Sequence, residues 1–201
     1  YDEDFASRVL KRTGREDFQD IIHGVGHFLE NEAQADENRV GITGISYGGF
    51  MTNWAVTQTD LFKAAVSENG ISYWLTSYAF SDIGLWFDEE ELIGEDPLEN
   101  ENYRELSPLF HAEKVTTPLL IIHSRQDYRC PLDQSVMFYH MLKKLGKEAY
   151  IAVFKKGAHG HSRQGSPKHR SKRYKLFTNF FKRKLVDEKE GFPAEEILGK
   201  K

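Results

Sequence analysis

The chain of 201 residues lacks several features that would define other classes of protein. Its single cysteine, Cys130, allows no disulfide within the chain, which excludes a small disulfide-stabilised fold and is consistent with a reducing compartment. Its apolar run at 118–122 is far shorter than the roughly 20 residues that cross a bilayer. We expect no signal peptide at this start, and because the chain opens at Tyr1 we expect this beginning to be cut. These absences predict a cytoplasmic location.

A large excess of charge of one sign is also missing. The sequence has 27 basic and 31 acidic side chains and a net charge of −4, so it has no broad positive field to hold nucleic acid or an anionic membrane. Hydrophobic residues make up 39% of the chain, which is enough for a buried core at this length. We therefore expect a globular domain that binds neither nucleic acid nor membranes.

Short apolar segments alternate with segments of helical periodicity. The expected strands are 39–43, 64–67, 119–123 and 150–154, and the expected helices are 16–32, 50–58, 133–145 and 171–185. This alternation implies right-handed crossovers between parallel strands. The predicted fold class is α/β, with a mostly parallel sheet covered by helices on both faces.

Two segments are interpreted as surface. Residues 87–105 carry nine acidic side chains and one basic one, which is typical of an exposed connection or a small cap. From Val186 onward the sequence is charged and interrupted by Gly191 and Pro193, which indicates a mobile tail or an interaction arm. The predicted domain therefore covers 1–185, and 186–201 is a charged tail.

A Gly-x-Ser-x-Gly motif lies between an expected strand and an expected helix. Gly44 and Gly48 would allow a sharp turn with Ser46 at its apex, leaving the backbone N–H of Tyr47 free to bind an oxyanion. A serine hydroxyl attacks a carbonyl only when a base takes its proton. Ser46 is therefore the candidate nucleophile and Tyr47 the candidate oxyanion donor, and an ordinary turn is the alternative.

The same architecture predicts an acid and then a histidine, each in a loop that follows a strand. Asp127 follows the strand expected at 119–123, and His159 follows the strand expected at 150–154. Asp127 would accept the Nδ1–H of His159, and Nε2 of His159 would take the proton of Ser46.

Each of these two residues has a rival nearby. Asp133 stands beside Pro131 at an expected helix start, where a capping role explains it. His161 follows His159 by two residues, and His159 is preferred because it comes first after the strand and Gly160 would allow close approach. The two histidines could form half of a metal site, but no nearby cluster completes it, so we predict no metal and no other cofactor.

Three separated motifs carry a family resemblance. They are Gly44-Ile-Ser-Tyr-Gly-Gly-Phe-Met-Thr-Asn-Trp54, Asp127-Tyr-Arg-Cys-Pro131 and Gly157-Ala-His-Gly160. From about Phe5 to Leu185 the chain resembles the catalytic domain of prolyl oligopeptidase-type serine peptidases, in the branch of acylaminoacyl peptidases and related dipeptidyl peptidases. The resemblance implies an α/β-hydrolase domain that cleaves short or N-acylated peptides through an acyl-enzyme, with Ser46, Asp127 and His159 as its triad.

The chain departs from that family at its beginning. We expect this chain to lack the family's β-propeller. Only about 38 residues precede Arg39, too few for the upstream strands and the loop that supplies a second oxyanion donor. We therefore expect the carboxyl-terminal part of a catalytic domain, weakly active alone because losing one such donor costs about 10²–10³ in kcat. The edge at Val40 to Thr43 should then pair with the upstream segment, a second copy or a rearranged part of this chain.

Substrate choice is hardly readable from the sequence. Tyr73, Trp74 and Trp86 follow the strand expected at 64–67 and are candidates for an apolar pocket on the acyl side of the scissile bond, although each could equally belong to the core. A peptide is the expected substrate. A carboxylesterase on the same triad and a noncatalytic interaction fragment stay open as alternatives.

Overall fold

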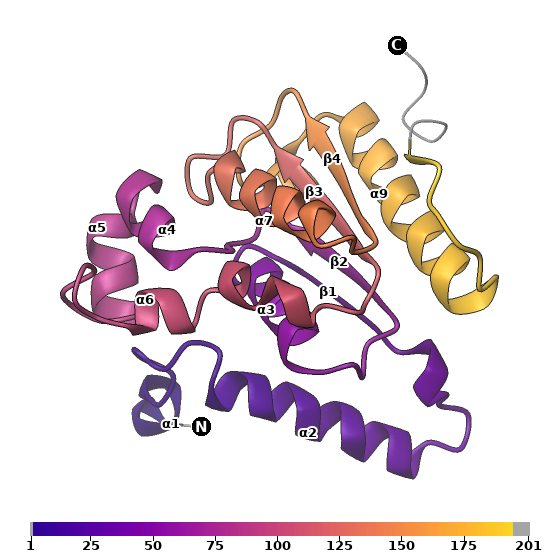
Figure 1. Ribbon diagram of the computed structural model, residues 1–201, viewed down its shortest axis with the longest axis horizontal. Coiled ribbons are helices and arrows are strands. Elements are labelled where there is room, and N and C mark those ends of the chain that lie inside the picture. Colours follow the sequence, from indigo (N-terminus) through magenta and orange to yellow (C-terminus); the bar gives the residue numbers. More distant parts are fainter. Residues whose placement is uncertain (1, 195–201) are drawn as a thin grey trace.

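Four parallel strands form the centre of the molecule in the computed structural model, which describes residues 2–194 (Figure 1). The strands are β1 (Gly41–Ile45), β2 (Ala64–Glu68), β3 (Leu119–Ser124) and β4 (Ala149–Phe154). Their spatial order is β1-β2-β3-β4, and each pairs in parallel with the next. β2 and β3 are buried along their whole length, as expected for strands covered on both faces.

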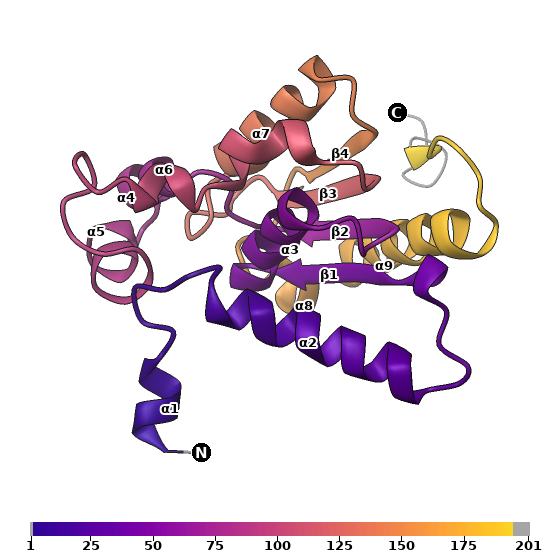
Figure 2. The same cartoon turned by 60° about the horizontal axis from the view of Figure 1, so that its bottom comes forward.

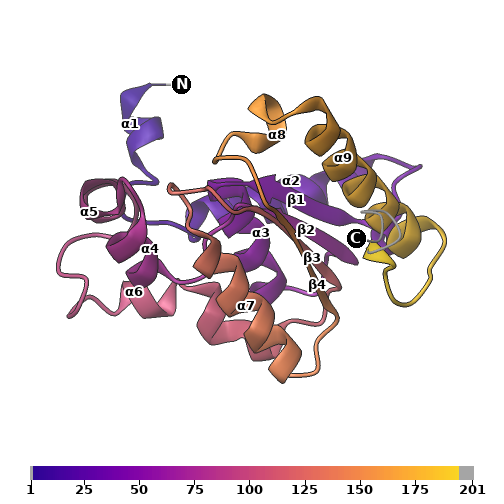
Figure 3. The same ribbon diagram turned by 90° about the horizontal axis from the view of Figure 1, so that it is seen from above.

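Helices cover both faces of the sheet (Figure 3). α3 (Tyr47–Gln58) and α7 (Leu132–Lys144) lie on one face, and α9 (Pro167–Phe181) lies on the other. Side chains along β3 alternate between these layers: Leu119 and Ile121 contact the α3 and α7 side, whereas Leu120 and Ile122 contact α9. The predicted α/β class is therefore confirmed.

α2 (Glu16–Asn31) runs beside β1 and α3 (Figure 2). Its buried Phe18 belongs to the same core cluster as Met51 and Trp54 of α3. Two acidic residues, Glu16 and Asp17, occupy its first turn, where negative charge is favourable to the helix dipole. The helix predicted at 16–32 is thus present and packs its apolar face against the elements around β1.

Several element boundaries differ from the predicted ones, among them α9, which begins at Pro167 and not at 171, and two of the differences have a clear local reason. β1 begins at Gly41 because a 3-10 turn, Glu37–Arg39, precedes it, capped by Asp36, whose Oδ1 accepts the N–H of Asn38 at 2.9 Å. α3 begins at Tyr47, before the predicted residue 50, because Ser46 with a φ of 64° turns the chain directly into the helix.

The acidic segment 87–105 forms part of a small helical cap beside the carboxyl end of β1 (Figures 1 and 2). Its elements are α4 (Trp74–Phe80), α5 (Gly84–Phe87), a π-helix (Asp88–Leu92) and α6 (Asn102–Glu105). Asp88, Ile93 and Tyr103 are each 2% exposed or less. Of the two predicted alternatives the small cap is the one present, and its surface location does not hold at these three positions.

One residue of the charged tail, Phe192, packs against β4 and α9. Phe192 is 9% exposed, and its ring lies 5.1 Å from that of Phe180 and 5.7 Å from that of Tyr150. Mobility of the tail from Val186 stays a prediction, and 195–201 lie outside the described residues. The remaining helical elements are α1 (Glu3–Ser7), Pro108–Lys114, α8 (His161–Gln164) and Lys182–Val186.

β1 is an edge strand. Gly41 and Thr43 are exposed, and within 2–194 β1 pairs with β2 alone. A groove of about 740 Å³ beside this edge is lined by residues of α2, β1 and the segment after α9, including Val25, Val40 and Leu185. No described segment pairs with this edge as a further strand, so pairing with an upstream segment or a second copy stays a prediction. None of the described helices has the length and apolar character needed to cross a membrane.

Candidate active site

Ser46 occupies a strained turn between β1 and α3. Its φ of 64° and ψ of −123° lie in a region that residues with a side chain rarely adopt. The turn is anchored at both ends, because the Ser46 N–H donates to the carbonyl of Glu68 at 3.0 Å and the Ser46 carbonyl accepts the N–H of Phe50 at 2.9 Å. A Cβ on Gly44 would lie 2.3 Å from the backbone of Gly48, so only glycine allows this close approach.

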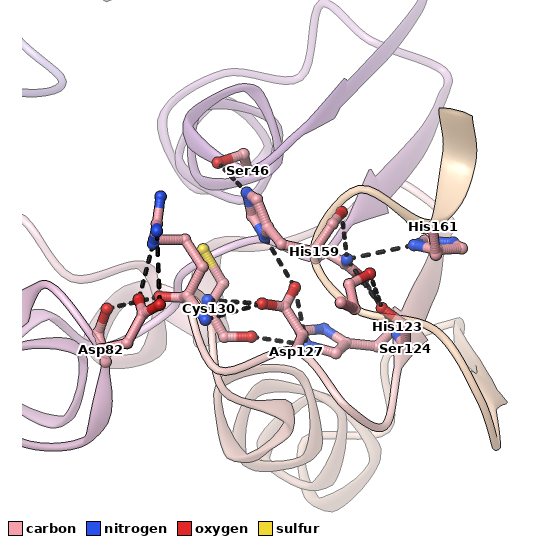
Figure 4. A network of polar contacts seen from close by, with 12 residues as sticks. Ser46, Asp82, His123, Ser124, Asp127, Cys130, His159 and His161 are labelled. Atoms are coloured by element: carbon pink, nitrogen blue, oxygen red, sulfur yellow. Dashed lines mark hydrogen bonds and ion pairs between the residues drawn. The ribbon is translucent and has the colours of Figure 1, made fainter. Parts of the chain in front are cut away.

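Three side chains from separate loops meet at this turn (Figure 4). Ser46 Oγ lies 2.7 Å from His159 Nε2, and His159 Nδ1 lies 2.8 Å from Asp127 Oδ2. An ionised carboxylate can only accept, so Nδ1 carries the proton and Nε2 accepts from the serine hydroxyl. The side chain of Asp127 is fully buried and that of His159 is 28% exposed. The structure thus brings together the three residues that the sequence analysis named.

The Asp127 carboxylate is held by its own turn. Oδ1 accepts the backbone N–H groups of Arg129 at 2.9 Å and Cys130 at 3.0 Å, which leaves Oδ2 for His159. His123 on β3 supports this turn: its Nε2–H donates to the Cys130 carbonyl at 2.9 Å, and its Nδ1 accepts from the Ser135 hydroxyl at 2.7 Å. Burial lowers the pKa of His123, so the neutral ring is favoured there.

Asn69 holds the loop that carries His159. Its Nδ2 donates to the His159 carbonyl at 3.2 Å and to Ser124 Oγ at 3.0 Å, and its Oδ1 accepts the Ser124 N–H at 3.0 Å. Sequence reasoning missed both residues, although the rule that located Asp127 could have found them, since Ser124 ends β3 and Asn69 directly follows β2.

The rival residues lie elsewhere. Nδ1 of His161 is 3.2 Å from Nδ2 of Asn69, and burial, together with the charge of Arg173, lowers the pKa of His161 to about 4. Asp133 is an exposed residue in the first turn of α7. Neither has Ser46 as a hydrogen-bond partner, whereas His159 does.

Tyr47 ties the serine turn to α2. As the first residue of α3, its backbone N–H has no partner within the helix. Its phenol donates to Oδ2 of Asp17, which also accepts the Gly14 N–H at 3.3 Å. Burial and the hydrogen bond to Asp17 raise the pKa of Tyr47, so the phenol stays protonated as a donor.

A cavity of about 600 Å³ opens beside Ser46. Its apolar lining comes mainly from the residues after α1 and from the helical cap: Val9, Leu10, Ile71, Ile83, Trp86, Phe87 and Leu92. Of the three predicted pocket residues, Trp86 lines this cavity. The other two predicted pocket residues lie outside this lining: Trp74 is fully buried in the core and donates to the Leu106 carbonyl at 3.1 Å, and Tyr73 packs against Phe110.

Within 2–194, no group of three or more His, Cys, Asp or Glu side chains is arranged to hold a metal ion. The arrangement that is present is a hydrogen-bonded hydroxyl, imidazole and carboxylate beside a cavity with largely apolar walls.

These features define an α/β-hydrolase: a parallel sheet, a serine at a strained strand-to-helix turn, and an acid and a histidine that follow later strands. Residues 1–188 match the prolyl oligopeptidase family. The chain belongs to that family, whose members are serine peptidases, and the resemblance drawn from its three motifs is confirmed.

Solved structures agree with this assignment. The acylaminoacyl peptidase of Pyrococcus horikoshii superposes with a TM-score of 0.96 at 72% identity, over 99% of this chain and 32% of that chain. A structure of an acylaminoacyl peptidase in complex with Z-Gly-Gly-Phe-chloromethyl ketone matches with the same TM-score at 73% identity, over 99% of this chain and 32% of that chain. The uncharacterized peptidase YuxL of Bacillus subtilis is 39% identical over 92% of this chain and 28% of its own length. The chain thus spans about a third of the length of these relatives.

Proposed function

We propose that this chain carries the catalytic triad and the acyl-side pocket of a serine peptidase that cleaves short or N-acylated peptides. The observation that carries the proposal is the unbroken hydrogen-bond chain from Ser46 Oγ through His159 to Asp127, at 2.7 Å and 2.8 Å. The serine stands on a strained turn, as a nucleophile in this fold does.

In the proposed reaction, Ser46 Oγ attacks the carbonyl carbon of the scissile amide and its proton passes to Nε2 of His159. The carbonyl oxygen becomes an oxyanion, which the backbone N–H of Tyr47 would stabilise. Collapse breaks the C–N bond, and the leaving amine takes the proton from His159. Water then attacks the acyl ester, gives a proton to His159, and that proton returns to Ser46 as the acid product leaves.

Asp127 acts by orientation and charge in this scheme. Its Oδ2 holds the Nδ1–H tautomer of His159, and its negative charge stabilises the imidazolium that forms when Nε2 is protonated. Because the Asp127 side chain is fully buried, water competes little for this interaction.

The proposed substrate follows from the cavity and from the relatives. The apolar walls beside Ser46 suit an apolar side chain on the acyl side of the bond, and one relative is solved with a chloromethyl ketone that carries phenylalanine. Names of relatives point to N-acylated peptides. We also expect the 201 residues to be weaker alone than in the intact protein, by about 10²–10³ in kcat if a second oxyanion donor lies outside them.

An active-site-directed fluorophosphonate tests the proposal in the intact protein. We expect the wild type to be labelled on Ser46, the Ser46→Ala variant to stay unlabelled, and the Ser171→Ala variant, which changes an exposed serine of α9, to be labelled like the wild type. A folded wild type that takes up no label would contradict the catalytic assignment and favour a noncatalytic interaction fragment.

Matched amide and ester substrates with the same acyl group separate the peptidase from a carboxylesterase on the same triad. A peptidase should hydrolyse the N-acylated amide with measurable turnover that Ser46→Ala abolishes. Turnover of the ester alone, with labelling intact, would identify an esterase.

A further inference from the structure

Asp88 is a buried acid in the cavity beside Ser46. It lines that cavity, it is 2% exposed, and among residues 2–194 its Oδ2 has no hydrogen-bond partner. Buried carboxylate oxygens in folded proteins are normally paired, and leaving one unpaired is unfavourable by several kcal/mol in general. An unpaired oxygen at a substrate cavity therefore points to a partner that a ligand supplies.

No positively charged side chain among the described residues of the cavity lining pairs with Asp88. Arg129, the cation among the described lining residues, pairs with Asp82 at 2.7 Å. Interaction with the Ser77 hydroxyl favours the charged form of Asp88, but burial outweighs it and raises the pKa of Asp88 to about 6. At neutral pH most of the carboxyl is therefore ionised and ready to accept a hydrogen bond.

Asp88, Cys130 and the nucleophile Ser46 line the same cavity. The buried thiol of Cys130 has a raised pKa, mainly through burial and then through the negative charges of Asp127 and Asp88, and its side chain also interacts with Ser46. A substrate side chain that enters this cavity beside Ser46 would therefore share it with Asp88.

We propose that Asp88 is a specificity-determining residue that makes this cavity prefer, on the acyl side of the scissile bond, an aromatic side chain tipped with a hydrogen-bond donor, tyrosine over phenylalanine. The proposal rests on the proposed peptidase function and names its substrate class.

The walls and the count of donors favour a phenol over a basic side chain. Trp86 and Phe87 line the cavity together with several aliphatic residues, and their ring centroids lie 5.4 Å apart in an edge-to-face arrangement. An aromatic ring of the substrate would therefore fit these walls well. A phenol brings one O–H donor, which Asp88 Oδ2 can accept. A lysine ammonium brings three donors, of which one free carboxylate oxygen would leave two without a partner among apolar walls.

Tyrosine and phenylalanine differ by that one hydroxyl, so paired substrates isolate the contact. We would measure kcat/KM of the intact protein for the p-nitroanilides of N-acetyl-tyrosine and N-acetyl-phenylalanine. Hydrogen bonds to charged groups are worth enough to give a preference of about tenfold for tyrosine. In Asp88→Leu, which removes the acceptor but keeps an apolar packing volume, the ratio should fall to about one while phenylalanine is still cleaved.

Two further variants control for folding and for general charge. Glu90→Gln removes an exposed negative charge of the same π-helix, at a residue outside the cavity lining, and should leave the ratio unchanged. If Asp88→Leu does not fold, Asp88→Asn keeps a neutral acceptor oxygen and should give a ratio between those of the wild type and one.

The outcomes separate the two proposals. A protein that takes no fluorophosphonate label and cleaves neither anilide contradicts the peptidase function itself. In a labelled, active protein, three results would contradict the role of Asp88 alone. They are a preference for phenylalanine, a tyrosine preference that stays at the wild-type level in both Asp88→Leu and Asp88→Asn, and faster cleavage of N-acetyl-lysine p-nitroanilide than of the tyrosine substrate.

Discussion

Arg173 of α9 forms a two-point ion pair with Glu68 at the end of β2. Its Nε lies 2.5 Å from Glu68 Oε2, and its Nη2 donates to Oε1. The Glu68 side chain is 2% exposed and that of Arg173 is 21% exposed. The backbone carbonyl of Glu68 also accepts the N–H of Ser46, so the pair fixes α9 to the residue that anchors the serine turn.

Replacing Arg173 with methionine should destabilise the fold by about 3 kcal/mol. Removing one partner of a buried ion pair generally costs about 3–5 kcal/mol, because the remaining charge stays desolvated. The lower end applies because Arg173 is partly exposed, so that water can reach the site it leaves. If this reasoning is correct, adding Glu68→Gln to Arg173→Met should recover most of the loss, because the stranded charge is then gone.

Urea denaturation followed by tryptophan fluorescence measures these differences for the wild type, both single variants and the double variant. Arg39→Met is the matched control, since its pair with Asp36 has side chains 53% and 36% exposed and such surface pairs contribute about 0–1 kcal/mol. Losses that simply add in the double variant, or a loss in Arg173→Met no larger than in Arg39→Met, would refute the claim of a stranded buried charge.

Two further predictions concern the serine turn and Asp88. Gly44→Ala should lower the folded yield and abolish fluorophosphonate labelling, because its Cβ would lie 2.3 Å from the backbone of Gly48. The control Gly26→Ala, whose Cβ would have nothing within 4 Å, should leave the stability of the fold unchanged or raise it by up to about 1 kcal/mol. Normal labelling of Gly44→Ala would contradict the close approach of Gly44 to Gly48. For Asp88, whose pKa is raised from 3.8 to about 6 by burial, the native state binds more protons than the unfolded state between these values, so stability should fall as pH rises from about 4 to about 6. Asp88→Asn should therefore be more stable than the wild type by up to about 3 kcal/mol above pH 6 and equal to it below pH 4. If the unfolding free energies of the variant and the wild type differed by the same amount at pH 3.5 and at pH 7.5, the raised pKa of Asp88 would be contradicted.

The positions of Ser46, Asp127 and His159 could be predicted because each follows a strand. Carboxyl ends of parallel strands lie at one edge of a sheet, so sequence order alone predicts that residues following β1, β3 and β4 converge. Their hydrogen bonds of 2.7 Å and 2.8 Å agree with that expectation. The same logic would have included Asn69 after β2, but an asparagine outside any motif gives no signal of its own.

The pocket could not be predicted in the same way. Trp74 and Trp86 belong to one aromatic segment, yet the first is fully buried in the core and the second is 51% exposed at the cavity. Which of them faces the cavity depends on how α4 and α5 turn between them. That turn includes a close approach of Gly84, where a Cβ would lie 2.4 Å from the Tyr78 carbonyl oxygen, a long-range fact that residue periodicity does not encode.

The acidic segment shows where a reading by composition fails. Charge counting treats the nine acids of 87–105 alike, but burial depends on which side of a short helix faces the core. Ile93 and Tyr103 are almost fully buried, and Asp88 lies at the same depth, 2% exposed.

The packing of the surrounding residues therefore keeps the Asp88 carboxylate buried, although contact with water would stabilise its charge. A group that lowers stability at neutral pH and has an unpaired oxygen at a cavity is most simply explained by a contact made only when a ligand is present. The same burial that destabilises the free protein would strengthen a hydrogen bond to a substrate, since water cannot replace it. On this argument the stability difference in Asp88→Asn and the substrate preference of the wild type share one physical origin, the desolvated carboxylate.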